Sequence, residues 1–209
     1  VQVGKPLDYA VFSTYVGQVS GDSDRARLVC DYFHSNSSRL PLNCPKGFAK
    51  KELVRAMSGC SFYLDLLGRL GSEKQFDALK LALDNQYQIR LKTLLSIMPV
   101  FNNEIDYAKL MNLICRKEAN AKAEALEVLK GVLGPKSADQ LISVFQPSAG
   151  AVEKADDLSM FVKKLSTSDS RWILSGLMLA FSEDDFSVHE EFVRDCLAND
   201  DELVRETAL

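Results

Sequence analysis

The chain has 209 residues, a length that suits one large domain or two small ones. Hydrophobic residues make up 46% of the chain and charged residues 26%, a balance typical of folded globular proteins that argues against wholesale disorder. The formal charge of -4 and the pI of about 5.3 disfavour DNA or RNA as partners, because nucleic-acid binding normally needs a basic face.

The expected elements are all helices. Apolar residues recur with a period of 3.6, and no stretch alternates between apolar and polar residues for long enough to predict a strand. The first two helices are expected at residues 7–19 and 22–35. A loop over residues 36–47, with Pro41 and Pro45, then separates an N-terminal helical region, residues 1–47, from a body formed by residues 48–209.

The body is expected to consist of short helices joined by short connections, which force sequential helices to pack antiparallel. Gly59 and Gly71 stand where a helix C-terminus favours a left-handed residue. The expected helices cover residues 48–57, 62–70, 72–83, 87–98, 105–115, 120–133, 137–145, 151–165, 171–181, 187–198 and 201–209.

Three helix starts are predicted from capping boxes, in which a Ser hydroxyl accepts a backbone N–H while a Gln or Glu three positions on reaches back. The pairs are Ser72 with Gln75, Ser137 with Gln140, and Ser187 with Glu190.

The last residues, 201–209, read DELVRETAL and resemble the second-helix consensus of HEAT repeats, with an acidic residue before an apolar–basic pair and a small residue three positions later. Weaker matches to the same consensus occur upstream, and the resemblance as a whole covers residues 72–209. The basic positions are Arg90, Lys122, Arg171 and Arg205, at intervals of 32, 49 and 34 residues. The register around residues 147–157 stays open, because the middle interval needs an insertion there.

The resemblance implies an α-solenoid of stacked antiparallel helical hairpins, in which each basic residue holds a carboxylate of the neighbouring repeat. An irregular helical bundle with the same periodicity is the alternative. Because the chain stops inside its most consensus-like helix, we expect it to be a fragment of a longer repeat protein. The implied function is a non-catalytic scaffold that binds another protein. A helical-repeat enzyme or nucleic-acid-binding protein of DNA-glycosylase type and a secreted effector with an irregular helical fold are the alternatives, the former disfavoured by the acidic charge.

No residue is assigned a catalytic, cofactor-binding or metal-binding role, and no cofactor is expected. His34 and His189 match no ligand spacing, so surface or capping roles are favoured for both. Residues 58–61 read SGCS and lack the Gly-x-Ser-x-Gly frame of a nucleophile elbow.

Two carboxylate clusters, residues 183–185 and 200–202, could form an acidic surface for a basic partner or a weak cation site. Stabilisation of helix N-termini by negative charge is the favoured interpretation. Trp172, the single tryptophan, lies in a segment with few polar residues on any face, so a core position is favoured over an interface.

Five cysteines without motif spacing favour free, buried thiols in a cytoplasmic protein, although Cys30 and Cys44 could pair in an oxidising compartment. A removed signal peptide also stays open, because the chain begins at Val1 rather than Met. The longest apolar stretch, residues 94–101, is far shorter than the roughly 20 residues that a membrane span needs.

Overall fold

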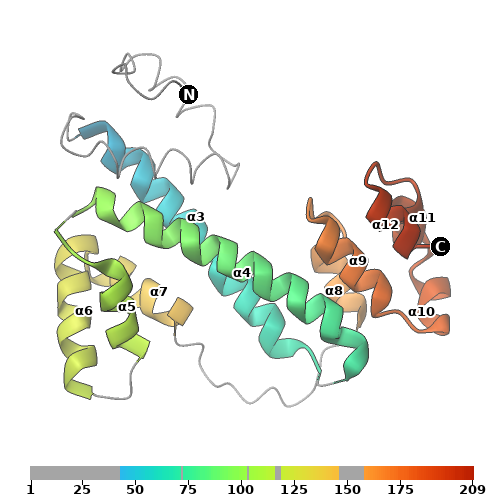
Figure 1. Ribbon diagram of the computed structural model, residues 1–209, viewed down its shortest axis with the longest axis horizontal. Helices are drawn as coiled ribbons and strands as arrows, with labels where there is room; N and C mark the ends of the chain where they lie inside the picture. Colours follow the sequence, from blue (N-terminus) through green and yellow to red (C-terminus); the bar gives the residue numbers. More distant parts are fainter. Residues whose placement is uncertain (1–42, 72, 103, 116–118, 146–157) are drawn as a thin grey trace. The chain divides into compact units, whose positions relative to one another are not determined.

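The structure is a computed structural model that describes residues 43–71, 73–102, 104–115, 119–145 and 158–209. All regular elements in these ranges are helices, which confirms the all-α prediction (Figure 1). None of the described helices is both long and apolar enough to cross a membrane. The helices expected at 7–19 and 22–35, the loop residues 36–42 and the open register at 147–157 lie outside the described residues.

The first described helix, α3 (Asn43–Arg69), is 27 residues long and corrects two predictions. The expected loop ends before Asn43 rather than at residue 47, because Pro45 falls in the first turn, where a helix needs no backbone N–H from it. The expected break at Gly59 does not exist. A Cβ atom on Gly59 would lie 3.3 Å from Cδ of Arg90, so the glycine serves close packing inside the helix.

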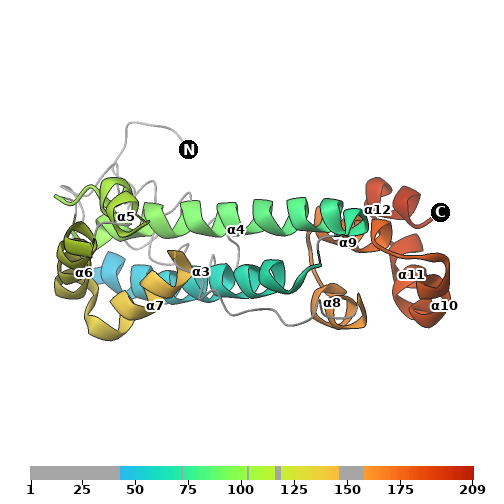
Figure 2. The ribbon, with the colours of Figure 1, turned by 90° about the horizontal axis from the view of Figure 1, so that it is seen from below.

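The next helix, α4 (Asp77–Ile97), is also a single element, where the sequence predicted two (Figure 2). Short 3-10 turns precede and follow it, η1 (Lys74–Phe76) and η2 (Met98–Val100). The predicted break near residues 84–86 is wrong because the apolar period continues through it, with Leu83 and Leu94 both buried. The capping serine predicted at position 72 lies outside the described residues.

Contacts divide the chain into two compact units, and α3 and α4 each contribute residues to both. Unit 1 comprises residues 1–61 and 89–148, with α5 (Tyr107–Cys115), α6 (Ala119–Leu133) and α7 (Pro135–Phe145). These bounds confirm the helices expected at 105–115 and 120–133. The predicted start of α7 at Ser137 is wrong, because Pro135 opens the helix directly after Gly134, whose φ is 82°.

Unit 2 comprises residues 62–88 and 149–209. Its C-terminal helices are α8 (Leu158–Leu165), α9 (Arg171–Leu179), α10 (Glu183–Val188), α11 (Glu190–Leu197) and α12 (Glu202–Thr207). The capping box predicted at Ser187 is wrong, because Ser187 lies inside α10. The box that opens α10 pairs Ser182 with Asp185 instead.

The core of unit 2 forms around α9, which contacts η1, α8 and α12. The largest fully buried side chains of this core come from α3, α4, α8 and α9. They are Leu66, Leu79, Leu83, Phe161, Ile173 and Leu177. Because η1, α8 and α12 cover α9, only the remaining face of this helix is open to solvent.

Candidate binding groove

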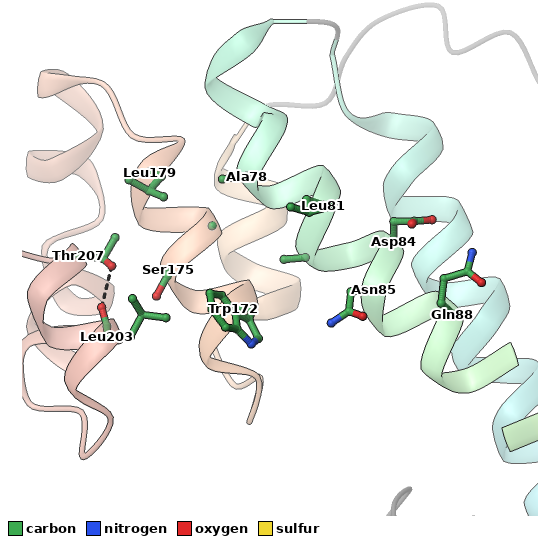
Figure 3. A pocket seen from close by; sticks show the side chains of 12 residues that line it. Ala78, Leu81, Asp84, Asn85, Gln88, Trp172, Ser175, Leu179, Leu203 and Thr207 are labelled. Atoms are coloured by element: carbon green, nitrogen blue, oxygen red, sulfur yellow. Dashed lines mark hydrogen bonds between the residues drawn. The ribbon is translucent and has the colours of Figure 1, made fainter. Parts of the chain in front are cut away.

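A groove of about 560 Å³ runs along α9 in unit 2. One wall comes from α4, the floor from α9 and the other wall from α12, as Figure 3 shows. The lining residues are Ala78, Leu81, Ala82, Asp84, Asn85 and Gln88 of α4, Trp172, Ser175, Gly176 and Leu179 of α9, and Leu203 and Thr207 of α12. On α4 and α9 these residues recur every three or four positions, which places them on one face of each helix.

Three large apolar side chains of this lining are exposed. Leu81 is 73% exposed, Leu179 59% and Trp172 52%. The prediction that Trp172 lies in the core is therefore wrong. The helix that carries it is apolar on every side, but its buried side is already filled by residues such as Ile173 and Leu177, so Trp172 is left on the surface.

The floor of the groove is set by a close approach of α9 to α4. A Cβ atom on Gly176 would lie 3.0 Å from Cα of Leu79, so only glycine fits there without a shift. The neighbouring Ser175 is buried, and its hydroxyl has no hydrogen-bond partner in the described part of the chain. Leaving such a group unpaired costs about 1–3 kcal/mol.

Asp84 is the one charged side chain among the twelve lining residues. It is exposed, and no described residue forms an ion pair or hydrogen bond with it. The neighbouring cation Arg171 already has partners: its guanidinium lies 5.1 Å from the centre of the Trp172 ring and 3.5 Å from a carboxylate oxygen of Asp201.

The C-terminal helices of unit 2 carry an excess of acidic residues. Residues 158–209 carry eleven Asp and Glu side chains against five Lys and Arg. Most of these cations are bound within the unit. Lys164 pairs with Asp65 at 3.4 Å, Arg194 pairs with Glu190 at 2.7 Å, and Arg205 donates to the Asn199 carbonyl at 2.7 Å.

The two carboxylate clusters have the helix-starting role that was favoured for them. Residues 183–185 form the first turn of α10, where both the side-chain hydroxyl and the backbone N–H of Ser182 donate to Asp185. These hydrogen bonds lower the pKa of Asp185. Asp201 is the N-cap of α12, and its carboxylate accepts the Leu203 N–H at 3.0 Å.

The other residues considered for chemistry do not converge on the groove. His189 lies at the start of α11, where its Nε2 is 3.3 Å from the Ser159 hydroxyl, and His34 is outside the described residues. Ser58, Gly59 and Cys60 lie inside α3 rather than at a turn. Cys60 and Cys196 are free and buried, as expected. Cys30 lies outside the described residues, and Cys44 lies in the first turn of α3. Within the described ranges, no three His, Cys, Asp or Glu side chains are grouped as metal ligands would be.

The groove was not predicted from the sequence. The signal for it is the excess of apolar residues on α9, since Trp172 and Leu179 fall outside the side that the core requires. Leu81 gives the same signal on α4, one position away from the buried Ala82.

A scan against protein-family models and searches of curated proteins and of solved structures find no match to this chain.

Proposed function

We propose that this chain is a non-catalytic protein-interaction module that binds an apolar segment of another protein in the groove of unit 2. The observation that carries the proposal is the exposure of Leu81, Trp172 and Leu179 along one groove. Exposed apolar side chains gathered in a concave surface are typical of protein-binding sites. Fully burying side chains of this size contributes about 1.5–3 kcal/mol each.

The shape of the groove favours an amphipathic helix as the bound segment. Its floor, α9, has nine residues and is therefore about 13 Å long, the length of two to three helical turns. A helix laid over α9, between α4 and α12, would present apolar residues at i, i+3 or i+4, and i+7, which is the recurring pattern of helix-in-groove recognition.

A HEAT-like scaffold is the finer architecture that we propose for this module. The resemblance of residues 201–209 supports it, and so does one ion pair. Arg171, a basic position of the repeat pattern, lies 3.5 Å from Asp201, the carboxylate that begins the next pattern. Arg205 departs from the pattern, because it donates to the backbone carbonyls of Asn199 and Asp200. No described feature favours the glycosylase or effector alternatives.

The proposal can be tested with a synthetic helical peptide of about 14 residues that has Leu on one face, Gln on the other and no Trp. Because Trp172 is the only tryptophan in the chain, its fluorescence reports directly on the groove. We expect a blue shift of Trp172 emission on binding, and weaker binding by Leu81→Ser and Leu179→Ser variants, whose exposed positions should leave folding intact.

Val188→Ser provides the matched control. Val188 is 67% exposed in the same unit but does not line the groove, so the variant should bind the peptide like the wild type. Peptide binding that all three serine variants weaken equally, or that none of them weakens, would contradict a role for this groove.

A further inference from the structure

We infer that the partner segment is a basic amphipathic helix, whose apolar face fills the groove and whose Lys or Arg side chain pairs with Asp84. This inference rests on the proposed function and adds the chemistry of the partner to it. It follows from three features of unit 2: the unpaired carboxylate in the groove, the lack of a cation among the twelve lining residues, and the acidic excess of residues 158–209.

Asp84 is positioned to contact a docked helix. Asp84, Asn85 and Gln88 all line the groove from α4, and Figure 3 shows Asn85 as the one of the three that lies toward Trp172. All three side chains are exposed, and Asp84 is the only one that carries charge. An unpaired carboxylate at the edge of an apolar groove is complementary to a cation on the flank of an apolar helix.

The lining holds no Lys or Arg that could compensate Asp84 from within. Arg171, the cation beside Trp172, already pairs with Asp201 and lies over the indole ring. The groove is therefore negatively charged at Asp84, whereas near Trp172 the positive charge of Arg171 is balanced by Asp201.

The charge balance of residues 158–209 also favours a basic partner. The eleven acidic side chains of residues 158–209 outnumber the five basic ones, of which Lys164, Arg171 and Arg194 are in ion pairs. Such an excess attracts a basic segment over distances up to about a Debye length, roughly 8–10 Å at physiological salt.

The same charges disfavour the other occupants of an apolar groove. Two copies that met through this surface would bring the two Asp84 carboxylates, and two acidic surfaces, toward each other. An anionic membrane would be repelled for the same reason. A basic helix is the occupant that gains from both the apolar lining and the charge.

Three peptides with the same Leu face and with Lys, Gln or Glu on the polar face would test the inference on the full chain. Trp172 emission again reports binding. We expect the Lys peptide to bind about tenfold more tightly than the Glu peptide at low salt, with the preference shrinking at high salt. We expect Asp84→Asn to weaken binding of the Lys peptide about three- to fivefold and to leave that of the Gln peptide unchanged.

Asp195→Asn is the control variant, because it removes the same charge from an exposed position of α11 outside the groove. Equal affinity for all three peptides would overturn the inference but leave the proposed function standing. If Asp84→Asn and Asp195→Asn weakened binding of the Lys peptide to the same extent, the role of Asp84 would be overturned. If none of the peptides changed Trp172 emission, the proposed function itself would be wrong.

Discussion

Gly176 of α9 lies close against the backbone of Leu79 of α4. A Cβ atom on Gly176 would lie 3.0 Å from Cα and 3.2 Å from the backbone nitrogen of Leu79. Both residues are buried, and the atoms in the way belong to the backbone, so no side-chain rotation could relieve the contact. The missing side chain of one residue therefore sets the depth of the groove between α4 and α12.

Replacement of Gly176 by Ala should destabilise the protein. The added methyl group has to push α9 away from α4, and overpacking of this kind typically costs about 1–3 kcal/mol. Urea unfolding followed by circular dichroism should show a lower midpoint at an unchanged slope. The displaced floor should also weaken binding of the Leu-faced peptide.

Gly131→Ala is the matched control, because Gly131 lies within α6 and a Cβ atom there would meet nothing within 4 Å. Relief of the poor helix propensity of glycine should stabilise this variant by up to about 1 kcal/mol. Were Gly176→Ala to gain stability as Gly131→Ala does, the close approach of α9 to α4 would be incorrect.

The sequence predicted the class of fold and several helices correctly, but it failed at helix boundaries for an identifiable reason. Gly59 reads locally as a helix end, yet the side chain of Arg90 packs against it in the middle of α3. Long-range packing of this kind leaves no trace in a local pattern. At Ser137 and Ser187 the residues of a capping box are present in the sequence, but they do not mark helix starts. The helices begin earlier, at Pro135 and directly after Ser182.

The groove was less predictable than the fold. Apolar periodicity identifies residues that could be buried, but it does not tell which of them the core has room for. Ile173 and Leu177 occupy the core side of α9, and Trp172 and Leu179 are left outside. The direction of the error at Trp172 is informative, because surplus apolar residues on a covered helix are what a binding surface requires.

The capping box of α10 should make stability depend on pH in the acid range. Hydrogen bonds from the side chain and backbone of Ser182 lower the pKa of Asp185 below its ordinary value of about 3.9. A lowered pKa in the folded state means that this stabilisation is complete above the ordinary value and is lost as the pH falls through the lower, folded value.

Asp185→Asn should therefore be less stable than the wild type at neutral pH, by about 0.5–1 kcal/mol, and the difference should shrink below about pH 4. Urea unfolding between pH 7 and pH 2 would measure this. Asp184→Asn removes a charge from the same turn without touching the hydrogen bonds to Ser182. A constant difference between Asp185→Asn and wild type across the whole range would contradict the capping role.

The buried thiols of Cys60 and Cys196 should be inert in the folded protein. Burial raises the pKa of Cys60 to about 12, against a smaller opposing effect of Arg90, and burial together with Asp195 raises that of Cys196 to about 11. At pH 8 fewer than about one in a hundred of either thiol would be ionised, and the thiolate is the form that iodoacetamide attacks. Peptide mapping by mass spectrometry should find both cysteines unmodified under native conditions and both labelled in urea.

Because α3 and α4 contribute residues to both units, we expect Cys60 and Cys196 to become labelled over the same range of urea concentration. Labelling of Cys60 in the native protein at the rate of an unfolded chain would show that the core around it is open.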